Sequence, residues 1–122
     1  CRGNHLRTTA PCQEKICGIL KFCMSDILAA NNWNVVQYAV LVHMLAQVSG
    51  LVAGELVHVI ADCHIYDRQI PLVEQMLELE PYPAPEFRLD PAVTDFYAFT
   101  PDSVQVENYR YHPFSARIPV AI

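Results

Sequence analysis

The sequence predicts one domain of mixed helices and strands, of the α/β (α+β) class, and three observations favour it. Residues 33–48 are apolar on nearly every side, which is typical of a buried helix. Residues 56–61 form a short continuous apolar run between turn residues, which predicts a strand buried on both faces. Residues 87–89 and 104–107 alternate apolar with polar side chains, the period of a half-buried strand.

Length and composition limit the possible functions. The chain has 122 residues, of which 52% are hydrophobic and 17% charged, with a net charge of −5. This composition excludes a disordered tail, and it disfavours binding to nucleic acid or a membrane surface, which needs clustered Lys and Arg. The longest apolar stretch is shorter and more interrupted than the about 20 residues of a membrane span. We therefore expect neither nucleic acid nor a membrane among the partners.

The cysteines and the chain start indicate the compartment. An odd count of five cysteines favours the reducing cytoplasm. Cys12, Cys17 and Cys23 are separated by four and then five intervening residues, which does not match the usual zinc spacings, so no metal is expected. The first residues lack both an initiator Met and an apolar signal sequence. We expect the chain to begin inside a longer reading frame or to be processed.

The first 30 residues show no sustained period of either a strand or a helix. Residues 16–30 are compatible with a helix, although Gly18 disfavours one.

The helix predicted at 33–48 has recognisable ends. Asn31 or Asn32 can cap its start, and Gly50 stands where a left-handed helix end is expected. His43 lies within this apolar segment and is expected to be a buried core histidine, as is His58 in the following strand. Because a short chain cannot surround such a helix alone, we expect it to pack against a missing part of the protein or a partner subunit.

The strand at 56–61 leads into a polar cluster at 62–67, and strand ends are where sites tend to lie in α/β sheets. His64 and Tyr66 are two residues apart on an extended segment, so both side chains leave the same side. Together they suit the binding of a ribose hydroxyl. An ordinary strand-end pair is the alternative interpretation.

A second helix is predicted at 70–80, with Pro71 in its first turn, where a missing N–H is tolerated. Three prolines then predict an extended connector, at Pro81, Pro83 and Pro85.

Two isolated residues carry candidate chemistry. The Asn34 amide has both a donor and an acceptor, so it can read the imide edge of a pyrimidine; a simple N-cap role is the alternative. The thiolate of Cys12, after Pro11, can add to an electron-poor carbon; an inert structural cysteine is the alternative.

Four segments in order resemble the thymidylate synthase family. Asn-Trp-Asn-Val-Val-Gln-Tyr-Ala at 32–39 is similar to the family's Phe-Asn or Trp-Asn pair and the Tyr-Ala run after it. The segment Asp-Cys-His-Ile-Tyr at 62–66 resembles its Asp-x-His-x-Tyr motif. The proline-rich connector at 81–85 and the terminal Pro-Val-Ala-Ile at 119–122 complete the set. Order and spacing agree from about Asp26 to Ile122.

This resemblance implies a fold and an activity. The family is a methyltransferase that makes dTMP from dUMP, with 5,10-methylenetetrahydrofolate as carbon donor and reductant. A cysteine thiolate adds to C6 of the pyrimidine, and C5 then attacks the folate-borne methylene. Its fold has a central buried helix and a mixed, curved sheet that forms a dimer interface. We expect residues 1–122 to be the C-terminal portion of one such domain, with 1–25 divergent.

The resemblance also implies roles for individual residues. Cys12, within Ala-Pro-Cys-Gln, resembles the nucleophile motif. Asn34 would recognise the pyrimidine, and His64 with Tyr66 would hold the sugar hydroxyl. Ala121 and Ile122 match the C-terminal flap that closes over folate.

The segment before Asp26 departs from the family pattern. Asp26 matches the site aspartate and would contact folate near dUMP. The family has Gln-Arg-Ser in this motif, whereas this chain has Phe22, Cys23 and Met24, followed by Ser25. Cys23, Met24 and Ser25 are thus the candidate substrate-binding residues here, with Cys23 in place of the phosphate-binding arginine.

Two hypotheses follow. In the first, the chain is the C-terminal part of a thymidylate synthase and needs the missing N-terminal half or a homodimer to complete the site. In the second, it is a degenerate or truncated homologue that acts as a non-catalytic nucleotide-binding or interaction module.

Overall fold

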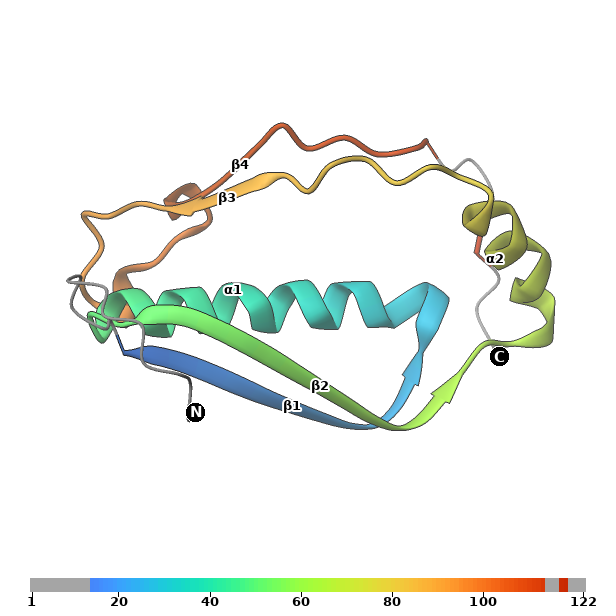
Figure 1. Ribbon diagram of the computed structural model, residues 1–122, viewed down its shortest axis with the longest axis horizontal. Helices are drawn as coiled ribbons and strands as arrows, with labels where there is room; N and C mark the ends of the chain where they lie inside the picture. Colours follow the sequence, from blue (N-terminus) through green and yellow to red (C-terminus); the bar gives the residue numbers. More distant parts are fainter. Residues whose placement is uncertain (1–13, 114–116, 119–122) are drawn as a thin grey trace, which may run out of the picture.

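A computed structural model describes residues 14–113 and 117–118 (Figure 1). In chain order, the helices and strands are β1 (Lys15–Asp26), the π-helix η1 (Ile27–Asn31), α1 (Asn32–Val48), β2 (Val52–His64), the 3-10 helix η2 (Asp67–Gln69), α2 (Ile70–Leu77), β3 (Glu86–Leu89), the 3-10 helices η3 (Phe96–Ala98) and η4 (Pro101–Ser103), and β4 (Val104–Glu107).

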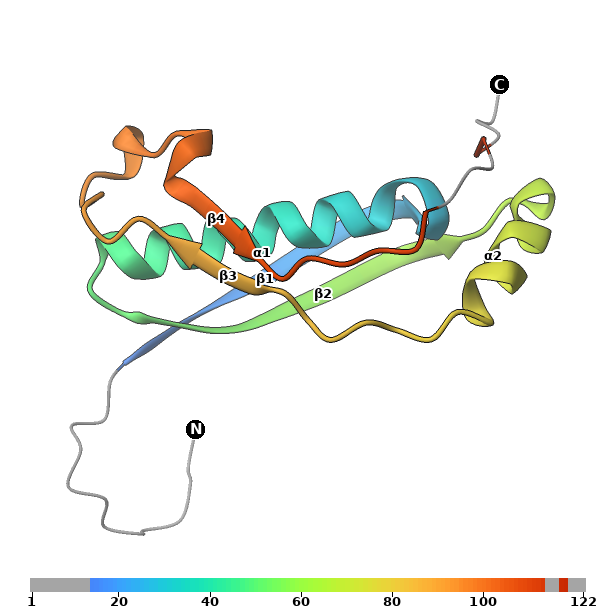
Figure 2. The same cartoon turned by 90° about the horizontal axis from the view of Figure 1, so that it is seen from above.

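The long helix α1 lies between two pairs of strands (Figures 1 and 2). On one side β1 and β2 pair in parallel, and on the other β3 and β4 form an antiparallel pair. Parallel and antiparallel pairing are thus both present among the described residues, in two separate two-stranded sheets. The mixed class of helices and strands is confirmed, as are the strands expected near 87–89 and 104–107.

The prediction of a helix over residues 16–30 is wrong, because most of that segment is strand β1. Its parallel register with β2 runs from Lys15 opposite Val52 to Asp26 opposite His64. This pairing overrides the weak local pattern. Gly18 has a packing role: a Cβ built there would lie 2.9 Å from Cγ2 of Val42, so its lack of a side chain lets α1 approach the strand closely.

The start of α1 differs from the prediction and its end agrees with it. Asn31 has helical backbone angles and makes no capping bond, because η1 runs directly into α1. The cap of this continuous helix is Asp26 instead. At the other end Gly50 has φ 67°. Its N–H and that of Leu51 donate to the carbonyls of Gln47 and Ala46, at 3.1 and 2.9 Å. This is the predicted glycine end, in the Schellman arrangement.

Burial is lower than the sequence predicted. The buried apolar side chains of the described residues are Leu20, Leu28 and Ala46. α1 is half-buried rather than enclosed, and His43 is exposed rather than in the core. His58 is half-buried, and its buried Nε2 has no hydrogen-bond partner in the described part of the chain. The reason is architectural: each face of α1 meets at most one two-stranded layer.

Strand β2 is likewise buried on one face only, so the expectation of two buried faces is wrong for this chain. Its side chains alternate between half-buried and exposed from Glu55 to Ala61. The exposed face of β1–β2, here called the outer sheet face, carries Val57 and Val59 beside Ile19, which is 71% exposed.

The second helix is shorter than predicted. α2 ends at Leu77 rather than at position 80, and Pro71 stands in its first turn as expected. The proline at 81 disfavours helical angles in the residue before it, which limits how far the helix can continue. Residues 81–85 have no regular secondary structure, as the prolines predicted.

Candidate functional site

Polar residues from distant parts of the chain meet where the parallel strands end. Asp26 is the last residue of β1, and its register partner His64 is the last residue of β2. Because the strands are parallel, both carboxyl ends lie at the same edge. Tyr66 follows two residues later and Gln69 three after that. These four residues are called the strand-end cluster below.

His64 and Tyr66 lie together, as their spacing predicted. Their ring centroids are 5.2 Å apart and the ring planes meet at 77°, an edge-to-face arrangement. Nδ1 of His64 is 3.6 Å from Oδ1 of Asp62, within reach of an ion pair when the imidazole is protonated. The side chain of His64 is partly exposed and Tyr66 is exposed, so both rings are accessible from solvent.

Asp26 joins three elements. Its Oδ1 accepts hydrogen bonds from the N–H groups of Leu28 and Ala29, both at 3.0 Å, and so caps η1. Its Oδ2 accepts from Nε2 of Gln69 at 3.1 Å. Burial raises the pKa of the carboxyl and is the largest single effect. The hydrogen bonds and the nearby His64 together outweigh it, so the pKa of Asp26 is lowered from 3.8.

Gln69 was missed by the sequence analysis. Its side chain is completely buried, which is unusual for a glutamine. The sequence held one cue: a Gln three residues after Tyr66 and just before the Pro71 helix start has the spacing of a residue that bonds back to a helix cap.

The other site residues predicted on β1 have different environments. Ser25 is 4% exposed, and its Oγ has no hydrogen-bond partner among the described residues. Cys23 is exposed with a free thiol. Met24 stands opposite Asp62 in the strand register. Cys12, Ala121 and Ile122 lie outside the described residues.

Asn34 is half-buried near the start of α1. The alternative interpretation as an N-cap is wrong, because the helix begins before it and Asp26 is the capping residue. Asp26 therefore fixes the start of the same continuous helix that carries Asn34. The predicted contact with a pyrimidine stays a prediction.

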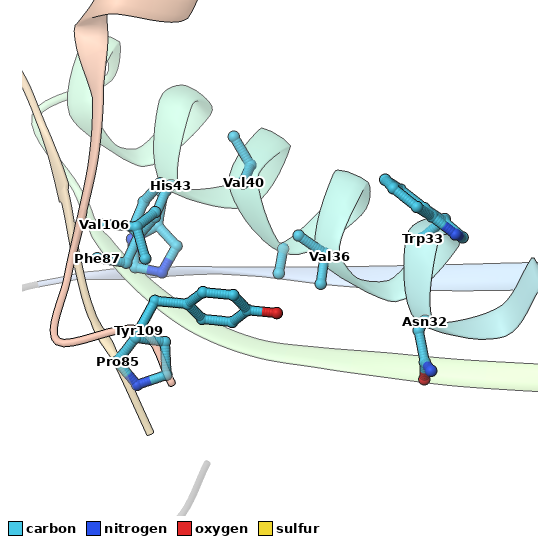
Figure 3. Close-up of a pocket in the computed structure, with 10 residues that line it drawn as sticks. Asn32, Trp33, Val36, Val40, His43, Pro85, Phe87, Val106 and Tyr109 are labelled. Carbon is cyan, nitrogen blue, oxygen red and sulfur yellow. The ribbon is translucent and has the colours of Figure 1, made fainter. Parts of the chain in front are cut away.

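A cavity of about 700 Å³ lies between α1 and the β3–β4 pair (Figure 3). Its lining includes Trp33, Val36 and Val40 of α1, with Phe87 and Tyr109 opposite. The Tyr109 ring extends along the helix toward Val36 (Figure 3). Trp33 is 79% exposed here. The helix surface that the sequence predicted to be buried thus faces an open, mainly apolar space.

The described residues contain neither a metal-binding cluster nor a membrane-spanning helix. In the described ranges, no group of three or more His, Cys, Asp and Glu side chains is placed to hold a metal ion. Within those same ranges no helix combines the length and the apolar character needed to cross a membrane.

The chain combines a polar strand-end cluster with a mixed α+β fold, and comparisons with known proteins identify its family. The thymidylate synthase family model matches residues 8–122. The chain is 45% identical over 82 residues to a thymidylate synthase of Clostridium beijerinckii and 42% identical over 87 residues to one of Bacillus phage phi3T. These alignments cover 66% and 71% of this chain. The chain therefore belongs to the thymidylate synthase family, whose members are methyltransferases.

A solved structure agrees with this assignment. Thermostable thymidylate synthase A from Bacillus subtilis matches with a TM-score of 0.79 and 39% identity, over 84% of this chain. The match covers 36% of that protein, and the two sequence matches each cover 31% of the relative. The chain thus spans about a third of the length of the proteins it resembles.

Proposed function

We propose that this chain is the C-terminal portion of a thymidylate synthase domain and supplies part of its dUMP site. The whole domain would convert dUMP to dTMP with 5,10-methylenetetrahydrofolate. The observation that carries the proposal is the meeting of Asp26, His64 and Tyr66 at one edge of the β1–β2 pair. The cytoplasm, expected from the cysteine count, is the proposed compartment.

In this proposal each polar group has a distinct task at the nucleotide. The His64 ring and the Tyr66 phenol bind the sugar hydroxyl, and Asn34 reads the pyrimidine edge. The buried hydroxyl of Ser25 lacks a partner within residues 14–113 and 117–118, which supports a role in contacting the ligand. Cys12 supplies the thiolate that adds to the pyrimidine ring.

In this proposal the two residues before Ser25 bind the substrate less strongly than the family's residues at the same positions do. Cys23 and Met24 precede Ser25 in β1, and Cys23 stands in place of the phosphate-binding arginine of the family. A thiol forms weaker contacts to phosphate than a guanidinium does, because it has neither the charge nor the paired donors.

In this proposal the Asp26 carboxylate has little hydrogen-bonding capacity left for the folate co-substrate. A carboxylate has about four acceptor positions, and three are used by the bonds to Leu28, Ala29 and Gln69. One position therefore remains for a donor on the folate. Ala121 and Ile122 would complete this side by closing over it, which excludes water from the reactive carbon.

Two apolar surfaces suggest how the domain is completed. We assign the outer sheet face, with Ile19, Val57 and Val59, to a homodimer interface, because exposed apolar side chains on a sheet favour association. We assign the cavity beside α1 to the rest of the domain, since about two thirds of the length of the relatives lies outside this chain. Sedimentation of the chain at micromolar concentration should show self-association, and a monomer would contradict the first assignment.

The catalytic proposal is tested with a mechanism-based ligand. The chain is incubated with 5-fluoro-dUMP and methylenetetrahydrofolate, alone and with the N-terminal two thirds of a relative, and examined by mass spectrometry. A covalent adduct on Cys12 supports the assignment. An adduct on Cys17 or Cys23, or none in the reconstituted sample, contradicts it. We expect the isolated chain to release no tritium from 5-tritiated dUMP, because most of the domain is absent.

A second function is favoured by one observation. Cys23 stands where the family resemblance expects a phosphate-binding arginine, and its thiol is exposed. This substitution favours a homologue that binds nucleotides or partner proteins without catalysis. Measurable dUMP binding by the reconstituted protein, without an adduct or tritium release, would support this alternative over the enzyme.

A further inference from the structure

The buried side chain of Gln69 links two residues of the proposed nucleotide site. Its amide lies between the end of β1 and the turn at Tyr66, with 0% of the residue exposed. Asp26 and Gln69 are 43 positions apart in the sequence. The contact therefore ties the strand that ends at Asp26 to the segment that follows β2.

Both ends of the amide are used. Nε2 donates to Oδ2 of Asp26 at 3.1 Å, and Oε1 accepts from the N–H of Tyr66 at 3.4 Å. The backbone N–H of Gln69 also donates to the carbonyl of Tyr66 at 2.7 Å. One residue thus holds the backbone of Tyr66 at two points while it restrains the carboxylate that caps η1.

We propose that Gln69 is a positioning residue of the nucleotide site. Through these bonds it holds Tyr66 against His64 and keeps Asp26 at the start of the helix that carries Asn34. Its effect on substrate rests on the proposed function, whereas its effect on geometry does not.

The choice of an amide at this place favours positioning over simple packing. A buried amide loses its hydration and is unfavourable unless both ends find partners. An apolar side chain of similar volume would fill the same space without that loss, but it would leave the carboxylate and the Tyr66 N–H without these partners. The glutamine satisfies a donor and an acceptor at once, which a carboxyl or an ammonium group does not do in its charged form.

Two variants separate the two bonds. Gln69→Met removes both at similar volume. Gln69→Glu keeps an acceptor for the Tyr66 N–H but replaces the donor to Asp26 with a second carboxyl group. Gln75→Met, on the exposed side of α2, is the matched control for the first. Circular dichroism establishes that each protein is folded.

Three NMR measurements are made on the folded proteins. They are the pKa of the Asp26 carboxyl group, followed through the chemical shift of its carbon, the cross-peaks between the His64 and Tyr66 rings, and the Kd for dUMP. In Gln69→Met we expect a raised Asp26 pKa, weaker ring cross-peaks and a Kd about tenfold higher, which corresponds to one lost charge-assisted bond. In Gln69→Glu we expect a raised Asp26 pKa with the ring cross-peaks preserved. Gln75→Met should match the native chain in all three.

The outcomes distinguish this inference from the proposed function. If the native chain does not bind dUMP, the proposed function fails, and the ring cross-peaks with the Asp26 pKa still decide the positioning role. Native values of all measurable quantities in both variants would overturn it. If Gln69→Met does not fold, Gln69→Glu decides alone: a raised Asp26 pKa with intact ring cross-peaks supports positioning, and an unchanged pKa overturns it.

Discussion

Replacement of Asp26 by alanine should destabilise the fold far more than the loss of an ordinary surface carboxylate. The side chain makes two bonds to η1 and one to Gln69. Loss of a helix cap costs about 0.5–2 kcal/mol, most often near 1. The buried amide of Gln69 would also lose its acceptor, which costs about 1–3 kcal/mol. Together these effects predict a loss of about 2–4 kcal/mol in the free energy of unfolding.

Urea unfolding followed by far-ultraviolet circular dichroism measures this loss, at one protein concentration so that association does not contribute. Asp95→Ala is the matched control, because Asp95 caps η3 through one bond to the Tyr97 N–H but is exposed. We expect it to cost about 0.5–1 kcal/mol. If Asp26→Ala costs no more than this control, Asp26 is only a cap, and its link to a buried partner does not contribute to stability.

Three further predictions follow from the same structure. Because the pKa of Asp26 is lowered in the folded chain, its contribution to stability is fully present above about pH 4 and is lost as the pH falls through the folded pKa. Urea unfolding between about pH 5 and pH 2 should show this loss, and Asp26→Asn should reduce the slope. Gly50→Ala should cost about 1–2 kcal/mol in urea unfolding because φ is 67°, and Gly50→Asn should cost less. A Cβ at this position would meet no described atom within 4 Å, so no steric clash adds to the cost. Val57→Lys on the outer sheet face should weaken self-association in sedimentation at least about tenfold, and Gln105→Lys on β4 should not.

The parts of the fold that the sequence could predict are those set by local patterns. The apolar segment of α1, the glycine at its end and the alternating residues of β3 and β4 are all visible within a few neighbouring positions. Strand β1 was not predicted, because its conformation depends on pairing with β2, as in the contact of Lys15 with Val52. The prediction that His43 is buried was also wrong. A sequence pattern shows that the neighbours of a residue are apolar, but it does not show which other elements cover that residue in the fold.

The candidate site divides in the same way. His64 and Tyr66 could be paired from the sequence because they are two residues apart on an extended segment. Asp26 was predicted as a site residue only from the family resemblance, since no local pattern connects it to a segment about 40 positions later. Gln69 was predicted neither from the local pattern nor from the family resemblance. Its role depends on complete burial and on two bonds that exist only in the folded chain.

In the proposed function, the strand-end cluster serves ligand binding and the two apolar surfaces serve assembly. Asp26, His64, Tyr66 and Gln69 are held by bonds and ring contacts within this chain. The outer sheet face and the cavity beside α1 instead expose apolar side chains that these residues do not cover. Under the proposed function, recognition of the nucleotide sugar depends on contacts that the chain already has, whereas catalysis also needs groups that a completed domain must add. Under the same proposal, a chain that has lost catalysis would still keep the contacts for nucleotide binding, so binding and adduct formation must be measured separately.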